Sequence, residues 1–216
     1  MYALAAPLVV ITTTDTPPYS YRDAATGEVV GIEIDIAREA AASLGRELVV
    51  RKEKFSDLLP MVNTGKADMA ASGITITEGR SQTVDFSIPY AVEGGMFLYR
   101  AEDPMPTMVR AEHLRVGTID STTYDIFLTR HWIDPIRFAS YPLALAALDE
   151  GRIDTVFFDS CGVRETVNKS GGRYKASRLE TRENYGIAVQ KGNMELKAAL
   201  DRAITAWKRR NRKGRH

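Results

Sequence analysis

The residues best suited to chemistry lie in one short stretch that runs from Ser72 to Arg80. Gly73 lets the backbone approach a ligand closely, and the hydroxyls around it donate and accept hydrogen bonds. Arg80 carries a planar fork of donors that suits a carboxylate or a phosphate. The stretch predicts half of an anion-binding pocket, although a polar loop with a solvated arginine has the same composition.

A second set of polar residues follows apolar runs in the other half of the chain. Asp159 offers an acceptor for an ammonium group, whereas Thr75 and Arg80 offer donors for a carboxylate. Backbone N–H groups near Thr122 and Thr123 would add donors, and the carbonyl of Gly73 would add an acceptor. Together these groups suit a zwitterion such as an α-amino acid.

Further residues are expected around the same ligand. Ser72 and Thr16 follow predicted strand ends, where ligands sit in open α/β sheets. Tyr19, Phe55 or Tyr90 could form aromatic walls, although each is also typical of a buried core. Candidates for contact with the ligand side chain are Thr13, Thr14, Thr16, Asp120, Tyr124 and Phe158.

Hydrophobic periodicity predicts the elements that must hold these residues. Residues 8–12 and 48–50 are compact β-branched runs that indicate buried strands. Apolar residues at helical spacing predict helices over 32–44 and 55–62, each followed by a glycine that ends it. A third strand is expected over 67–71. This β-α-β-α-β order predicts a parallel sheet with crossover helices.

The second half repeats this organisation. A strand over 114–118 precedes a helix from Tyr124, and the junction over 150–156 echoes the one over 64–70. Extended runs at 94–100 and 185–189 are predicted to cross between the two halves of the fold. Asn193 can cap a last helix that returns to the first half. We therefore predict two α/β lobes, 1–92 plus 187–216 and 93–186, with the ligand cleft between them.

Composition excludes several classes of protein. The 216 residues suffice for two small lobes, and 44% hydrophobic with 26% charged residues is ordinary for a globular protein. A net charge of +1 argues against nucleic-acid binding, and the basic run over 208–213 is expected to be a solvated helix end. No apolar run approaches the roughly 20 residues of a membrane span. One cysteine and three histidines predict no metal site, and no cofactor motif is found.

Five ordered blocks resemble the bacterial extracellular solute-binding proteins of the polar amino-acid type. They lie at Pro17–Tyr21, Gly31–Ala37, Ser72–Arg80, Asp85–Tyr90 and Tyr185–Gly192. The resemblance implies a two-lobed type II periplasmic-binding-protein fold, in which each lobe is a mainly parallel sheet flanked by helices and two hinge strands join the lobes. It implies that Arg80 and Thr75 bind the ligand α-carboxylate, and that Asp159 and the carbonyl of Gly73 bind the α-ammonium.

The resemblance also implies partners and a location. The expected protein is a monomer without cofactor that captures an α-amino acid by lobe closure and delivers it to the membrane subunits of an ABC transporter. It would work in the periplasm or outside the cell. Residues 1–6 lack the charged region and apolar core of a secretion signal, so the sequence is expected to start as a mature protein does.

Two departures and two alternatives stay open. Family members for basic or amide side chains often carry an aspartate near Thr13 or Thr14 and an aromatic residue near Thr16, whereas here Asp15 lies beside threonines. One alternative is an enzyme similar to cyclohexadienyl dehydratase, but Gly162 stands where that branch has its catalytic glutamate. The other is the ligand-sensing domain of a receptor. The sequence predicts a binding protein and not an enzyme.

Overall fold

The computed structural model describes residues 6–212, without the side chain of Arg212. Its contacts divide the chain into two compact units. Unit 1 comprises residues 1–92 and 184–216, and unit 2 comprises residues 93–183. The predicted lobes put the second crossing at 186/187 instead of 183/184. Predictions for residues 1–5 and for Lys213 fall outside the described part of the chain.

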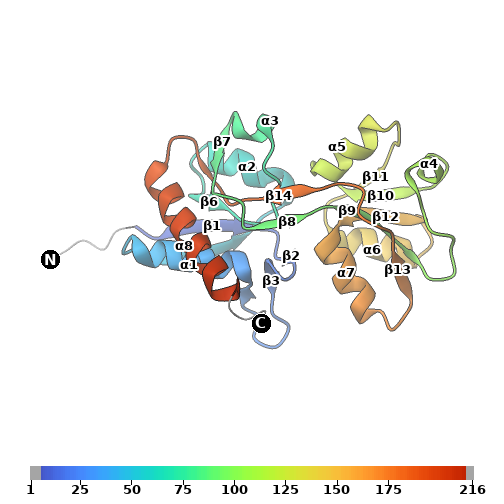
Figure 1. Cartoon of the computed structure of the whole chain (residues 1–216), viewed down its shortest axis with the longest axis horizontal. Helices are drawn as coiled ribbons and strands as arrows, with labels where there is room; N and C mark the ends of the chain where they lie inside the picture. The colour runs from blue at the N-terminus through green and yellow to red at the C-terminus, as the bar shows by residue number, and fades with distance from the viewer. Residues whose placement is uncertain (1–5, 213–216) are drawn as a thin grey trace. The chain divides into compact units, whose positions relative to one another are not determined.

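Unit 1 is built on a five-stranded sheet in the order β5-β1-β6-β15-β7. Figure 1 labels β1, β6 and β7 of this sheet. Strand β1 pairs in parallel with its neighbours β5 and β6, as the predicted β-α-β-α-β order requires, and the last two pairings of the sheet are antiparallel. A small sheet of three strands lies between the first strand and the first helix in sequence. The elements are β1 (Leu8–Thr12), β2 (Asp15–Thr16), β3 (Ser20–Arg22), β4 (Val29–Val30), α1 (Ile32–Ser43), β5 (Leu48–Lys52), α2 (Phe55–Asn63), β6 (Met69–Ala70), α3 (Glu78–Ser81), β7 (Val84–Phe86), β15 (Ala188–Gln190) and α8 (Met194–Arg212).

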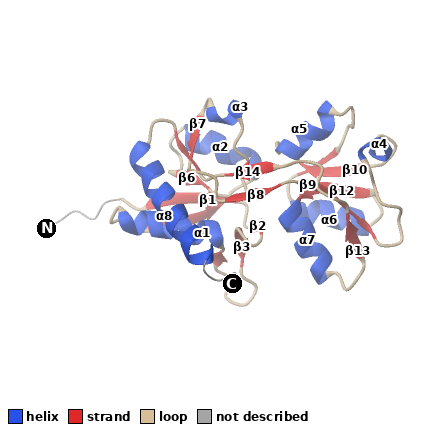
Figure 2. Cartoon of the chain, viewed as in Figure 1, coloured by secondary structure: helices blue, strands red, loops and turns tan. Residues whose placement is uncertain are grey.

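Unit 2 repeats this plan with the sheet order β11-β10-β12-β9-β13. Its first two pairings are parallel and its last two are antiparallel. Figure 2 shows β9, β10, β12 and β13 as red strands. The elements are β9 (Gly95–Arg100), α4 (Met108–Ala111), β10 (Val116–Ile119), α5 (Thr123–Arg130), β11 (Ile136–Phe138), α6 (Tyr141–Asp149), β12 (Thr155–Asp159), α7 (Ser160–Lys169) and β13 (Tyr174–Ala176). The two crossings form a two-stranded sheet of β8 (Ala91–Glu93) and β14 (Glu183–Tyr185).

The echoed junctions occupy equivalent places in the two sheets, before β6 and before β12. Gly65 and Gly151 both adopt left-handed backbone, with φ of 72° and 67°, and end α2 and α6. The aspartate three residues after each glycine then accepts a backbone hydrogen bond at the start of the neighbouring parallel strand, within β1 in unit 1 and one residue before β10 in unit 2. Asp68 Oδ2 accepts from the Val9 N–H and Asp154 Oδ2 accepts from the Arg115 N–H, both at 2.7 Å. The sequence similarity therefore reflects the same strand anchor in each unit.

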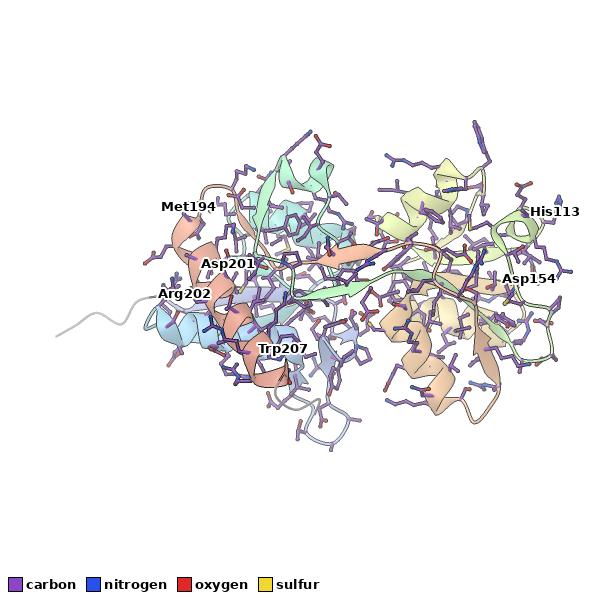
Figure 3. All side chains as sticks on the ribbon, viewed as in Figure 1. His113, Asp154, Met194, Asp201, Arg202 and Trp207 are labelled. Atoms are coloured by element: carbon purple, nitrogen blue, oxygen red, sulfur yellow. The ribbon has the colours of Figure 1, made fainter. Side chains whose placement is uncertain are left out.

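The last helix belongs to unit 1, where it packs beside α1. Asn193 caps it as predicted, because the Leu196 N–H donates to Asn193 Oδ1 at 3.2 Å. Farther along, Asp201 accepts from the Ile88 N–H at 2.7 Å and pairs with Lys197 (Figure 3). The bond to Ile88 joins the helix to the segment that follows β7, so the last helix of the chain is attached to unit 1 by hydrogen bonding as well as by packing on α1.

Candidate functional site

In unit 1, the loop after β6 is held by hydrogen bonds from two other segments. The Ser72 Oγ lies 2.7 Å from the Thr13 Oγ1. Gly73 adopts φ of 60°, a conformation that side chains disfavour, and its N–H donates to Glu33 Oε1 at 3.1 Å. A Cβ at Gly73 would lie 3.3 Å from the nearest atoms of Thr16 and Tyr185, so the loop backbone packs closely on both residues.

Arg80 lies in α3, one turn beyond this loop. Thr77 caps the helix by accepting from the Arg80 N–H at 3.2 Å, which fixes the backbone that carries the guanidinium. The guanidinium donates to the Thr75 carbonyl at 2.9 Å and lies 5.7 Å from the centre of the Phe55 ring. The structure therefore brings together three predicted site residues, Arg80, Thr75 and Phe55. A cation on an aromatic face is stabilised and oriented there.

Tyr19 and Thr16 are the other predicted residues of unit 1. Both are buried, with 5% of each exposed. The Tyr19 ring lies 5.5 Å from the Tyr90 ring and 5.9 Å from the Tyr185 ring, both in edge-on packing. These three tyrosines form a buried cluster next to the Gly73 loop, and aromatic contacts of this geometry stabilise it.

In unit 2, Thr122 and Thr123 begin α5. The Thr122 hydroxyl caps the helix by accepting from the Asp125 N–H at 3.2 Å, and it donates to the Ile119 carbonyl at 2.7 Å. The Thr123 hydroxyl donates to Glu183 Oε2 at 2.6 Å. The first N–H groups of a helix have no partner within it and carry its positive end, so this terminus suits an anion.

Asp159 ends β12 and caps α7. Its Oδ1 accepts from the Cys161 N–H at 2.7 Å, and its Oδ2 accepts from the Tyr124 hydroxyl at 3.4 Å. Only 3% of the residue is exposed. Burial raises the pKa of Asp159 to about 7, and the charges of Glu93 and Glu183 add to that rise. A positive group arriving at this carboxylate would favour its ionised form.

Sequence reasoning missed three acidic residues that the structure places beside the Gly73 loop of unit 1 or beside Asp159 of unit 2. Glu33 contacts the Gly73 loop in unit 1, whereas Glu93 and Glu183 act on Asp159 in unit 2. Glu33 lies in the first turn of a helix, where an acidic residue is ordinary. Glu93 and Glu183 are far apart in sequence, and no local pattern connects them with Asp159.

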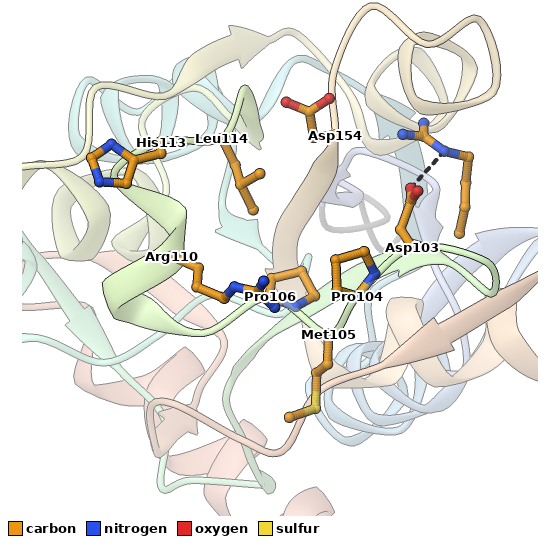
Figure 4. A pocket seen from close by; sticks show the side chains of 9 residues that line it. Asp103, Pro104, Met105, Pro106, Arg110, His113, Leu114 and Asp154 are labelled. Atoms are coloured by element: carbon orange, nitrogen blue, oxygen red, sulfur yellow. Dashed lines mark ion pairs between the residues drawn. The ribbon is translucent and has the colours of Figure 1, made fainter.

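Unit 2 also contains a surface cavity of about 270 Å³ that none of the predicted site residues lines (Figure 4). The ion pair between Arg100 and Asp103, 2.8 Å long, lies at its edge. The lining residues are Arg100, Asp103, Pro104, Met105, Pro106, Arg110, His113, Leu114 and Asp154. Asp154 pairs with Arg115 at 2.6 Å, and Asp159 is not among the lining residues.

The part of the chain that the structure describes contains neither a metal-binding cluster nor a membrane-spanning helix. Between residues 6 and 212, no three His, Cys, Asp or Glu side chains are grouped so that they could hold a metal ion. Over the same range, no helix combines the length and the apolar character that crossing a membrane requires.

Comparison with known proteins gives consistent matches. The family described as bacterial extracellular solute-binding proteins, family 3, matches residues 8–213. The ABC transporter arginine-binding protein 1 of Escherichia coli is 29% identical over 191 residues, which cover 85% of this chain and 78% of that protein. The histidine-binding periplasmic protein of Salmonella typhimurium is 28% identical, covering 83% of this chain and 74% of that protein. The arginine-bound form of truncated ArgBP from T. maritima superposes with a TM-score of 0.87 at 32% identity, covering 93% of this chain and 95% of that one. The fold is therefore that of the type II periplasmic binding proteins, as predicted.

Proposed function

Because this chain belongs to the bacterial extracellular solute-binding proteins, family 3, we propose that it captures an α-amino acid and delivers it to the membrane subunits of an ABC transporter. Relatives named for arginine and histidine binding support this function. The periplasmic location in the name of one relative supports a site of action outside the cytoplasm. We propose that the two units are the lobes and that closure around the ligand excludes water.

Unit 1 would bind the ligand carboxylate. The fork of Arg80 is oriented by the Thr75 carbonyl and the Phe55 ring, which reduces the freedom that binding would otherwise remove. Thr75 and Ser72 would add polar contacts, while Phe55, Tyr19 and Thr16 would border the ligand. The oriented guanidinium is the single observation that carries the proposal.

Unit 2 would supply the remaining groups. Asp159 would accept the α-ammonium, with the carbonyl of Gly73 from unit 1 as a second acceptor. Since burial holds the pKa of Asp159 at about 7, a bound ammonium would lower that pKa and favour the ionised pair. The backbone N–H groups of Thr122 and Thr123 would add donors to the ligand carboxylate from the start of α5.

The first loop supports a ligand with a basic side chain. Thr13 donates from its hydroxyl to Asp15, and the same hydroxyl lies 2.7 Å from that of Ser72. The Asp15 carboxylate is therefore fixed beside the loop that carries Gly73, where it can accept from a cationic group. The arginine bound by the structural relative from T. maritima points to the same ligand class.

Isothermal titration calorimetry against the twenty amino acids tests the function. We expect micromolar or tighter affinity for one or a few of them, with basic side chains preferred. Failure of all twenty to bind would refute amino-acid capture, and selective binding of acidic or apolar amino acids would refute the basic preference. An assay for prephenate turnover is the enzymatic control, and no turnover is expected, since the relatives are binding proteins and Gly162 supplies no acid.

A further inference from the structure

Glu33 is a fully buried carboxylate that the proposed function leaves without a role. It lies in the first turn of α1 and has no exposed surface. No other Asp or Glu among the described residues of unit 1 is as buried. Burying an ionisable group is costly unless it is hydrogen-bonded, so its partners decide what it does.

The partners of Glu33 belong to the ligand loop and its support. Its Oε1 accepts from the Gly73 N–H at 3.1 Å and from the Tyr90 hydroxyl. No hydrogen bond reaches its Oε2 from the described residues. The backbone around Glu33 is also fixed, because its own N–H donates to the Tyr19 carbonyl at 2.9 Å. The carboxylate is thus a rigid acceptor directed at Gly73.

The bond to Gly73 controls the orientation of the loop. A peptide is planar, so a fixed Gly73 N–H fixes the whole Ser72–Gly73 peptide. The left-handed φ of 60° then places the carbonyl carbon of Gly73 relative to that peptide. Farther along, the Ile74 carbonyl accepts from the Gly186 N–H at 3.0 Å and the Ile76 N–H donates to the Asn184 carbonyl at 2.8 Å. Glu33 is therefore one of several anchors of the loop, and it is the one at Gly73.

The groups that act on Glu33 are uncharged: the hydroxyls of Tyr90 and Ser20 and the N–H of Gly73. Tyr90 bonds to it, and the rings of Tyr19 and Tyr185 pack on that of Tyr90. Within the described residues, no ion pair joins Glu33 to a charged side chain of β3, β4, β5 or α8. Burial accordingly raises the pKa of Glu33 to about 7, and the hydrogen bonds from Tyr90 and Gly73 oppose that rise.

We propose that Glu33 is a positioning residue, which holds the Gly73 peptide in the orientation that the Ser72–Arg80 loop needs to bind its ligand. It touches no ligand and acts through Gly73. The inference rests on the proposed function and adds to it a residue outside the ligand contacts.

Three variants test the role by calorimetry with the amino acid that the wild type binds best. Glu33→Met keeps the length of the side chain and removes the acceptor, so affinity should fall roughly tenfold to hundredfold, as loss of a hydrogen bond to a charged group predicts. Glu33→Gln keeps a neutral acceptor, so it should match the wild type near pH 6 and bind several-fold more weakly near pH 8, where the wild type is ionised. Asp35→Asn is the matched control: Asp35 is an exposed acid of the same helix that pairs with Arg38, and its loss should leave affinity unchanged.

A spectroscopic measurement without ligand separates positioning from general stability. The Gly73 amide proton resonance should titrate with a midpoint near pH 7 in the wild type and should not titrate in Glu33→Gln. If Glu33→Met does not fold, this resonance and the pH dependence of affinity in Glu33→Gln still test whether Glu33 positions Gly73. Equal affinity of wild type and folded Glu33→Met, or of wild type and Glu33→Gln at every pH, would overturn the proposal, as would a Gly73 resonance that ignores pH. A wild type that binds no amino acid refutes the proposed function instead.

Discussion

Replacing Arg80 with alanine is the most direct test of the carboxylate site. The guanidinium is held by the Thr75 carbonyl at 2.9 Å and by the Phe55 ring at 5.7 Å, so it meets a ligand already oriented. A fork that makes two charge-assisted hydrogen bonds, each worth roughly 1.5–3 kcal/mol, contributes about 3 kcal/mol or more. Arg80→Ala should therefore weaken binding of the best amino acid by at least roughly 100-fold in calorimetry.

Two further variants make the test of Arg80 specific. Arg80→Lys keeps the charge and loses the planar fork, so its affinity should lie between those of the wild type and Arg80→Ala. Arg38→Ala removes an arginine from an exposed ion pair of the same unit and should change affinity by less than about twofold. A loss of tenfold or less in Arg80→Ala, with unchanged thermal stability, would remove Arg80 from the carboxylate role.

Three other outcomes follow from the same geometry. Asp159→Asn should weaken amino-acid binding by roughly tenfold to hundredfold and spare an analogue that lacks the ammonium, whereas equal losses for both ligands in calorimetry would contradict its role. Gly73→Ala should lower both the melting temperature and the affinity, because it adds a side chain 3.3 Å from its neighbours in left-handed backbone. In the control Gly27→Ala, φ is 73° and the space is open, so the free energy of unfolding should fall only by the backbone strain of about 1 kcal/mol. Folding raises the pKa values of Glu33 and Asp159 to about 7, from 4.5 and 3.8. Between pH 4 and 7 the folded state therefore binds more protons than the unfolded state. As the pH rises through that range, the contribution of both groups to the free energy of unfolding falls. Denaturant unfolding of ligand-free Glu33→Gln should show a flatter pH dependence there, and an unchanged slope would show that Glu33 does not titrate in this range.

Local sequence patterns were sufficient for the elements because helices and strands bury one face at a fixed period. The spacing of apolar residues over 32–44 and 55–62 predicted α1 and α2, and the glycines that follow adopt the left-handed backbone that ends them. The similar junctions at Gly65 and Gly151 also predicted that two sheets share one plan. The local pattern did not reveal what the aspartates at these junctions do, which is to accept backbone hydrogen bonds from Val9 and Arg115, residues that are distant in sequence.

The candidate groups for a zwitterion were likewise readable from residue type and from position after a strand. The sequence predicted that the loop from Ser72 to Arg80 carries an arginine for a carboxylate and that Asp159 suits an ammonium. Their roles stay predictions until binding is measured. The structure adds how Arg80 is oriented, because its contact with the Phe55 ring joins two segments that the sequence separates.

The sequence by itself determined the order of the elements and the polar residues available at the strand ends, since both depend on neighbours along the chain. Only the tertiary structure decided the surroundings that give those residues their properties. It buried Glu33 against Gly73 and Tyr90, and it placed Glu93 and Glu183 where their charges raise the pKa of Asp159. The physical reason is that burial and Coulomb interaction depend on distance in space, which chain folding sets and local periodicity does not encode.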